Sequence, residues 1–139
     1  MDYYREEQLD KEIYPEDQNQ IEKIIKVAIL KIGIKCDTLG YGYIFESVMM
    51  VITHPNLVYN AKKLFTKVGE KLGITNYLKI ESNIQNAINF TYNMRGFNSI
   101  NELYGLDVIR PDHKPTVAEL INLLAQYYLL RMFKTEEIS

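Results

Sequence analysis

The spacing of apolar residues predicts that the first half of the chain forms three helices. The first begins near Asp17 and ends at Gly33, with apolar residues every three or four positions at Ile21, Ile24, Ile25, Ala28 and Ile32. The second is predicted over residues 43–53, because TLGYG at 38–42 interrupts the pattern and Pro55 disfavours helix before it. The third is predicted over residues 57–72, and Gly73 suits the position after its end.

The second half continues in the same way. We predict a fourth helix over residues 76–93, a short one over 98–104, a loop over 106–115 and a last helix that begins at Thr116 and ends at residue 133. Thr116 and Glu119 have the spacing of a capping box. No segment alternates convincingly as a strand does. The expected fold is all-α, a compact bundle of about six helices with no significant sheet.

The organisation expected along the chain is simple. Residues 1–16 form an acidic, flexible N-terminal arm, residues 17–133 form the helical domain, and residues 134–139 form a polar tail. With 139 residues and 47% hydrophobic content, the chain has the length and the apolar content of one packed domain.

The last helix is apolar around nearly its whole circumference. Residues 120–133 read LINLLAQYYLLRMF, in which only Asn122, Gln126 and Arg131 are polar. Such a helix is either buried deeply in its own domain or covered by a partner. The sequence therefore leaves two alternatives, full burial and a homodimer contact.

Several classes of protein are disfavoured by what the chain contains. Its one cysteine, Cys36, cannot form an internal disulfide, and we expect it to be buried like most free cysteines. With two histidines far apart, we expect no metal site; we also expect no cofactor and no enzyme activity, because no catalytic constellation or phosphate-binding loop is recognisable. The start MDYYREEQLD is not a signal peptide, and no apolar run suits a membrane helix, so we expect a cytoplasmic protein.

Charge is spread unevenly over the sequence. The formal net charge is −2, yet residues 1–23 carry −5 and residues 54–96 carry +4. A localised basic patch matters more for nucleic-acid binding than the total charge does. The alternative is that these lysines are ordinary solvated helix residues.

Residues 68–75, VGEKLGIT, resemble the first helix and the turn of a helix-turn-helix. Gly69 is small enough for a second helix to cross closely, Gly73 supplies the turn, and Thr75 or Asn76 can cap the next helix. In this motif the second helix lies in the DNA major groove. The helix over residues 76–93 is thus the expected recognition helix.

The expected recognition helix has a polar face that is unusually rich in amides. Opposite its apolar side lie Lys79, Ser82, Asn86, Asn89 and Asn93, with Gln85 and Asn83 beside them. Asn and Gln can form two hydrogen bonds with adenine, whereas a merely solvated face usually favours better helix formers such as Glu, Lys and Arg. We therefore expect five residues to contact base edges: Lys79, Ser82, Gln85, Asn86 and Asn89. We expect seven to contact phosphates: Lys62, Lys63, Lys67, Lys71, Thr75, Asn76 and Lys114.

The sequence resembles the C-terminal DNA-binding effector domain of the stage-zero sporulation response regulator, the family of transcription factors that start sporulation. The resemblance covers about residues 24–130. It is carried by IGI at 32–34, GYGYI at 40–44, AI at 87–88 with Tyr92, SI at 99–100, LYG at 103–105, KPT at 114–116 and EL at 119–120. It implies a six-helix domain that contains a helix-turn-helix and binds double-stranded promoter DNA, often as a pair of domains on tandem sites.

Three departures from the family pattern accompany this resemblance. The family's domain follows a receiver domain, whereas here residues 1–20 stand in that place, so we expect no phosphorylation switch within this chain. The family's recognition helix is rich in arginine and has a histidine; here the matching positions are Lys79, Ser82, Gln85 and Asn86, with Glu81 retained. The turn at Gly73-Ile74 also looks one residue longer.

Two hypotheses follow for the function. The leading one is a sequence-specific DNA-binding regulator of transcription. The alternative is a module that binds DNA weakly or not at all and acts by protein interaction, as a homodimer or as an antagonist of a related regulator. In this second case the acidic arm would cover the basic face as a mimic of DNA.

Overall fold

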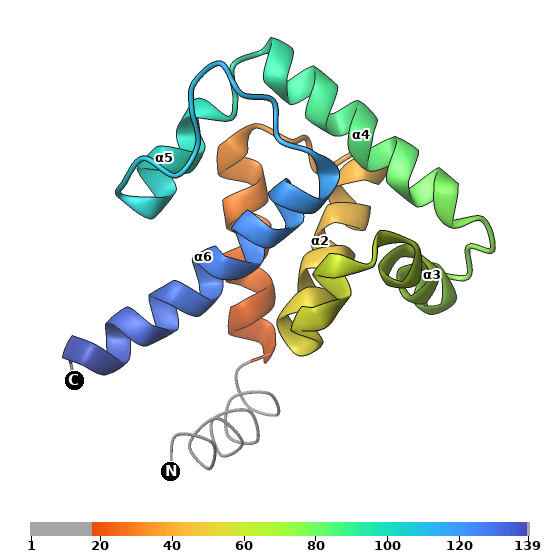
Figure 1. The fold of residues 1–139 in the computed structure, drawn as a ribbon, viewed down its shortest axis with the longest axis horizontal. Helices are drawn as coiled ribbons and strands as arrows, with labels where there is room; N and C mark the ends of the chain where they lie inside the picture. Colours follow the sequence, from red (N-terminus) through yellow and green to blue (C-terminus); the bar gives the residue numbers. More distant parts are fainter. Residues whose placement is uncertain (1–17, 139) are drawn as a thin grey trace.

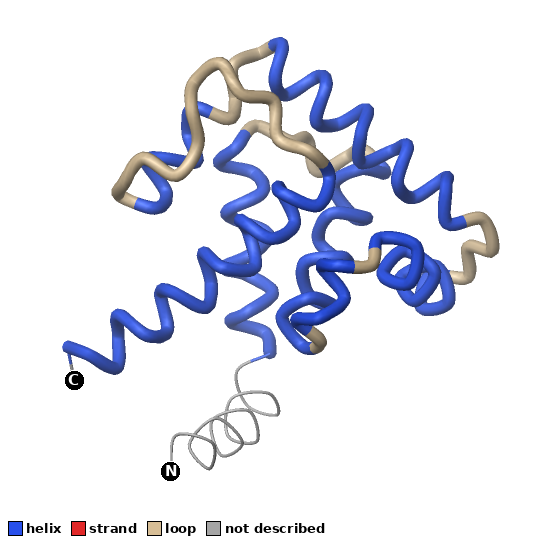
Figure 2. The backbone as a smooth tube through the Cα atoms, viewed as in Figure 1, coloured by secondary structure: helices blue, strands red, loops and turns tan. Residues whose placement is uncertain are grey.

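The computed structural model describes residues 18–138, and in this part the regular secondary structure is all helical, with loops and turns between the helices (Figures 1 and 2). Side chains are described up to residue 131. After a first helix over residues 18–32, the elements are α2 (Leu39–Thr53), the 3₁₀ helix η1 (Pro55–Tyr59), α3 (Ala61–Leu72), α4 (Tyr77–Asn93), α5 (Asn98–Tyr104) and α6 (Val117–Ile138). The all-α prediction is confirmed. The predicted arm over residues 1–16 and the cap at Asp17 lie outside the described residues.

Helix α2 begins earlier than the sequence pattern predicted. Thr38 is its N-cap, and the Thr38 hydroxyl accepts a hydrogen bond of 3.3 Å from the backbone N–H of Tyr41. Gly40, which we took for part of an interruption, is instead a point of close helix crossing: a Cβ there would lie 2.8 Å from the Cβ of Ala87 on α4. The prediction of a start at residue 43 was wrong because a glycine inside a helix can serve packing rather than a turn.

The predicted third helix is in fact two elements. Pro55–Tyr59 forms the short 3₁₀ helix, and the chain then restarts as α3. Asn60 is the reason, because its side-chain oxygen accepts a hydrogen bond of 3.1 Å from the backbone N–H of Lys63. In a continuous helix this N–H would bond to the backbone carbonyl four residues before it. Here a capping side chain takes that role, and the helix starts at the cap.

Helix α2 is the centre of the packing. It contacts α3, α4, α6 and η1, and its buried residues Ile44, Val48 and Val51 join the main hydrophobic core. The first helix adds most of its predicted stripe: Ile21, Ile25, Ala28 and Ile32 are almost completely buried, Ile24 is only partly buried, and Ile29, which was not predicted, is buried as well. The β-branched residues on the predicted apolar stripes therefore form much of the core, together with Leu, Phe and Tyr residues.

The apolar side of helix α6 packs against other helices of the same chain. Among the α6 side chains described, which end at residue 131, five are buried: Leu120, Ile121, Leu124, Ala125 and Tyr128. Tyr104 on α5 donates its hydroxyl hydrogen bond to the carbonyl of Leu123, and burial raises the pKa of Tyr104 to about 12. The helix continues to Ile138, past the predicted end at residue 133. Burial thus accounts for much of the apolar sequence, while the homodimer contact stays a prediction.

The helix-turn-helix has the close crossing that its glycines predicted. A Cβ on Gly69 would lie 2.4 Å from the carbonyl oxygen of Ile74, so only glycine fits there. Gly73 ends α3 in the left-handed conformation, with φ of 74°. Of the two candidate caps, Asn76 is the one used: its side-chain oxygen accepts a hydrogen bond of 3.1 Å from the backbone N–H of Leu78.

Two further observations bear on expectations from the sequence. Cys36 is exposed, in the turn between the first helix and α2, so the prediction that it is buried was wrong. Ile34 fills the buried position of this turn, while Cys36 and its neighbours Lys35 and Asp37 are exposed. Among the described residues, the helices are too short or too polar to cross a membrane.

The crossing at Gly69 gives a direct test of the fold. We expect Gly69→Ala to lower the free energy of unfolding by about 1–3 kcal/mol, because the new methyl group must displace the backbone of the turn. Urea denaturation followed by circular dichroism measures the change. Gly42→Ala in α2 is the matched control: nothing lies within 4 Å of a Cβ there, so it should be neutral or stabilising. Equal effects of the two variants would contradict the close crossing.

Candidate nucleic-acid interface

Helix α4 is held by its apolar side and leaves a polar side free. Ile80, Ile84, Ile88 and Thr91 are buried against the rest of the domain. These positions recur every three or four residues, so the opposite side of the helix must face outward. In Figure 1, α4 lies at the periphery of the domain, connected to α3 by the short turn at Gly73.

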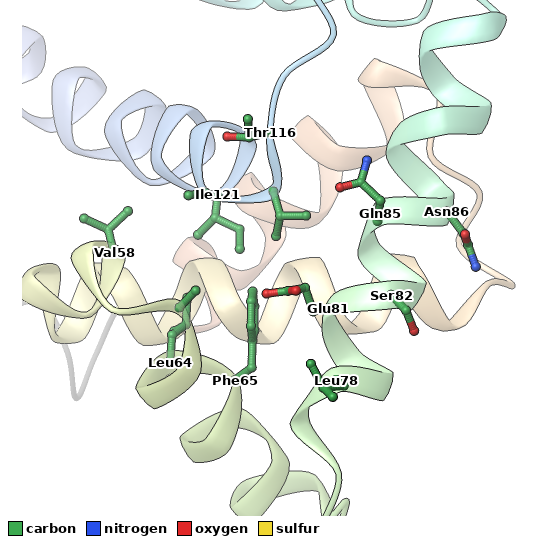
Figure 3. Close-up of a pocket in the computed structure, with 13 residues that line it drawn as sticks. Val58, Leu64, Phe65, Leu78, Glu81, Ser82, Gln85, Asn86, Thr116 and Ile121 are labelled. Carbon is green, nitrogen blue, oxygen red and sulfur yellow. The ribbon is translucent and has the colours of Figure 1, made fainter.

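Three of the predicted base-contacting residues are exposed together on this outer side: Lys79, Ser82 and Asn86. The Ser82 hydroxyl donates a hydrogen bond of 3.2 Å to the carbonyl of Lys79, which leaves its oxygen as an acceptor. Figure 3 shows Ser82 and Asn86 directed away from α6. Within the described residues, the Asn86 side chain has no hydrogen-bond partner, so both its donor and its acceptor are available to a ligand.

The other two predicted base contacts, Gln85 and Asn89, are half-buried and joined to each other. The amide of Gln85 donates a hydrogen bond of 3.2 Å to the side-chain oxygen of Asn89. The same oxygen accepts a hydrogen bond of 3.1 Å from the ammonium of Lys114. Both lone pairs of that oxygen are therefore in use, and Asn89 can offer a ligand only its NH₂ group.

Lys114 brings a positive charge to the second half of α4. Besides its hydrogen bond to Asn89, its ammonium lies 5.5 Å from the centre of the Tyr92 ring. It comes from the loop before α6, a long way from α4 in sequence. The structure thus places this predicted phosphate-contacting residue beside the predicted base-contacting ones.

The lysines of α3 do not form a single group. Lys62, Lys63 and Lys67 are exposed, but Lys71 forms an ion pair of 2.7 Å with Glu46 on α2. Lys63, Lys67 and Lys71 follow one another at steps of four residues, so they share the side of α3 that faces this glutamate. Lys62 lies toward the side of Gly69, which is the side that crosses the turn into α4. Of the four, Lys62 is therefore placed best for a ligand held by α4.

The two predicted phosphate contacts in the turn also differ. Asn76 uses its side-chain oxygen to cap α4, which leaves its NH₂ group free. Thr75 is exposed, and no described residue bonds to its hydroxyl. Both sit at the N-terminal end of α4, where backbone N–H groups favour an anion.

The sequence did not reveal how the loop over residues 106–115 is held. Asn101 on α5 organises one end: its side-chain oxygen accepts hydrogen bonds from Val108 (2.8 Å) and Ile109 (3.0 Å). Tyr92 on α4 fixes the other end by donating a hydrogen bond of 3.1 Å to the carbonyl of Asp112. This second contact is what brings Lys114 to α4. An asparagine just before a structureless segment was the one signal available in the sequence.

The predicted capping box at the start of α6 is present and extends to His113. The backbone N–H of Thr116 donates to Glu119, and the backbone N–H of Glu119 donates to the Thr116 hydroxyl, at 3.2 and 3.1 Å. The imidazole of His113 lies 3.0 Å from the other carboxylate oxygen. Burial alone would raise the pKa of Glu119, but the hydrogen bonds from Thr116 and His113 outweigh it and lower that pKa.

A hollow lies between the start of α3, the first half of α4 and the first turn of α6; we call it the α3–α4–α6 pocket (Figure 3). Its volume is about 570 Å³. Leu64, Phe65 and Ile121 line its apolar part, and Glu81 and Gln85 come into it from α4. Ser82 and Asn86, from the outer row of α4, complete its lining, so the hollow borders the exposed side of this helix.

The described domain is positively charged although the whole chain is not. Residues 18–131 contain thirteen Lys and Arg against nine Asp and Glu, a net charge of +4, compared with −2 for the full sequence. The negative excess lies in the terminal segments. The helical domain by itself therefore has the sign of charge that suits a nucleic acid.

Comparison with known protein families adds the deciding observation. Residues 21–128 match the family described as "Sporulation initiation factor Spo0A C terminal". This chain belongs to that family. Its members are DNA-binding domains of transcription factors, and the match covers every element from the first helix to the middle of α6. The resemblance found in the sequence is thereby confirmed, together with a general role in DNA binding and sporulation-type transcriptional regulation.

The lowered pKa of Glu119 gives a pH-dependent prediction. A carboxylate with a folded-state pKa below its unfolded value of 4.5 stabilises the protein above that pH, and this contribution is lost as the pH falls through the folded-state pKa. We expect Glu119→Gln to lower Tm near neutral pH, and the difference from wild type to close in acid. Thermal unfolding between pH 3 and pH 7 measures it. Glu102→Gln is the control, since Glu102 is exposed and no described residue pairs with it. A Tm difference between the wild type and Glu119→Gln that stays constant across this pH range would argue against a stabilising role of the Glu119 charge.

Proposed function

We propose that this protein is a sequence-specific DNA-binding regulator of transcription whose helix α4 enters the major groove. The observation that carries the proposal is the outer face of α4, where Lys79, Ser82 and Asn86 are exposed side by side on a helix-turn-helix. Membership of a DNA-binding family supports it. Action on promoter DNA would take place in the cytoplasm.

The contacts within α4 suggest different roles for the predicted base-contacting residues. Asn86, with its whole amide free, suits the pair of hydrogen bonds that reads adenine. Lys79 suits the acceptors of guanine or a nearby phosphate. Asn89 can only donate, because Lys114 and Gln85 occupy its oxygen. The proposed division is thus that Asn86 and Lys79 read bases, while Gln85 and Asn89 mainly position Lys114.

The proposed phosphate contacts predict modest affinity. Lys114 is bonded to Asn89 on α4, Lys62 shares the side of α3 that carries Gly69, Thr75 and Asn76 lie at the N-terminal end of α4, and Lys71 is held by Glu46. Each neutralised phosphate adds about 0.9 to the slope of log affinity against log salt concentration. A protein with few such contacts should show a shallow slope and bind best at low salt.

The test starts from a pool of random duplexes selected at about 50 mM salt, where phosphate contacts are still strong. On the selected site, we expect Asn86→Ala to weaken binding about tenfold, which corresponds to about 1.4 kcal/mol, because the pair of bonds to one base is lost. Binding to unselected DNA should stay unchanged. Lys62→Ala should instead weaken both and reduce the salt slope by about 1. Fluorescence anisotropy measures the affinity for the selected site, the affinity for unselected DNA and the salt slope.

Matched substitutions elsewhere on the surface serve as controls. Gln126→Ala removes an exposed amide from α6, and Lys31→Ala removes an exposed charge from the first helix; neither should change DNA affinity. No enrichment of any duplex, or equal losses for Asn86→Ala and Gln126→Ala, would refute the proposed use of α4.

A second candidate is a role in protein interaction, by self-association. It rests on an apolar strip on the side of α4 away from α6, where Leu39, Phe90 and Met94 are exposed by 56%, 48% and 68%. Leu39 and Phe90 line the same hollow, and Met94 follows Phe90 by one turn. Contiguous exposed apolar surface is typical of protein contacts.

Sedimentation of the free protein tests this second candidate. If the strip is a dimer contact, the protein sediments as a dimer, and Phe90→Ser shifts it to the monomer. Tyr59→Ser is the control, because Tyr59 is 87% exposed at the end of η1 and does not belong to the strip. A monomer at all concentrations would exclude this contact and leave the DNA-binding proposal untouched.

A further inference from the structure

The α3–α4–α6 pocket combines an apolar interior with one unpaired carboxylate. Leu64, Phe65 and Ile121 are buried residues that form its interior, and Val58 adds to the wall. Figure 3 shows the Glu81 carboxylate turned into the hollow, next to the Phe65 ring. Glu81 is only half-exposed, and no described residue gives it a hydrogen bond or an ion pair.

The Glu81 carboxylate is partly shielded from water and has no cationic partner among the described residues. Burying a charge costs free energy unless the charge is paired and hydrogen-bonded. The neighbouring polar groups, the Gln85 amide and the Thr116 hydroxyl, line the same hollow without bonding to Glu81. The Glu81 carboxylate is therefore available to pair with a positively charged group that enters the pocket.

The negative sign also argues against DNA as the occupant of this hollow. A phosphate at Glu81 would meet a charge of its own sign, whereas the side chains of Ser82 and Asn86, at the rim of the hollow, are directed away from α6. The pocket's volume of about 570 Å³ lies within the range of about 300–1,000 Å³ typical of small-molecule sites. Size and charge together select a compact organic cation.

We propose that the α3–α4–α6 pocket binds a small organic ammonium ion with an apolar body. The ammonium pairs with Glu81, the apolar group packs on Leu64, Phe65 and Ile121, and Gln85 and Thr116 accept further hydrogen bonds. Because Ser82 and Asn86 belong to the rim of the same hollow, an occupant also contacts the recognition helix. The site thus lets the domain respond to a small organic cation.

The experiment uses the full chain without DNA, so its outcome is independent of the proposed DNA binding. The probes are 2-phenylethylammonium and its neutral counterpart 2-phenylethanol, with hexylammonium and 1-hexanol as a second pair. Titration is followed by amide chemical shifts in ¹H–¹⁵N correlation spectra. We expect the shifts to centre on Phe65, Glu81 and Ile121, and each ammonium to bind about tenfold more tightly than its alcohol, a difference of about 1.4 kcal/mol.

Glu81→Gln provides the decisive variant, because it keeps the size of the side chain and removes the charge. It should abolish the preference for the ammonium while leaving the alcohol's affinity unchanged. Glu70→Gln is the control on the exposed side of α3 and should keep the preference. The native spectrum of each variant shows that it has folded.

Three results would overturn the proposal. They are equal binding of ammonium and alcohol to the wild type, shifts that centre outside the pocket, and an ammonium preference that survives Glu81→Gln. A parallel arm adds the ammonium to the complex with selected DNA. Displacement or tightening of DNA extends the proposal to regulation, whereas an unchanged DNA affinity with intact ammonium binding restricts it to a ligand site uncoupled from DNA.

Discussion

The close packing of α4 on the rest of the domain is the constraint on which the other features depend. Two glycines make it possible: Gly40 lets α2 approach Ala87, and Gly69 lets α3 approach the turn before α4. With these contacts, Ile80, Ile84 and Ile88 become fully buried. A helix buried so completely on one side has a fixed rotation about its axis, and that rotation decides which side chains reach solvent.

That fixed rotation separates two chemistries on neighbouring sides of one helix. Lys79, Ser82 and Asn86 face outward, where groups that both donate and accept hydrogen bonds suit a base edge. Glu81 faces inward to the pocket, where a negative charge suits a cation. A duplex and a small cation would thus use the same helix without competing for the same atoms, although Ser82 and Asn86 border both.

Few charged side chains lie around α4, and hydrogen bonds or ion pairs hold some of them in place. Lys114 is held by Asn89, and the loop that carries it is anchored by Tyr92 and Asn101. Lys71, in contrast, is committed to Glu46. Because amides outnumber lysines around α4, the specificity of the proposed DNA binding would depend more on hydrogen-bond pattern and less on charge attraction.

The sequence by itself determined the fold class, the apolar stripes, the capping box at Thr116 and the two glycines of the helix-turn-helix. These features are local, because periodicity and capping are set by residues within one or two turns of each other. It also placed the outer row of α4 correctly as far as Lys79, Ser82 and Asn86 are concerned.

The tertiary structure decided what depends on contacts between distant segments. The partner of Lys71, the joining of Lys114 to Asn89, the use of Gly40 in a crossing and the pocket beside Glu81 all involve residues from different helices. No local pattern encodes which side chain on α2 or in the loop after α5 will meet a given position of α4. That information exists only once the helices have packed, because burial and pairing are properties of the assembled core.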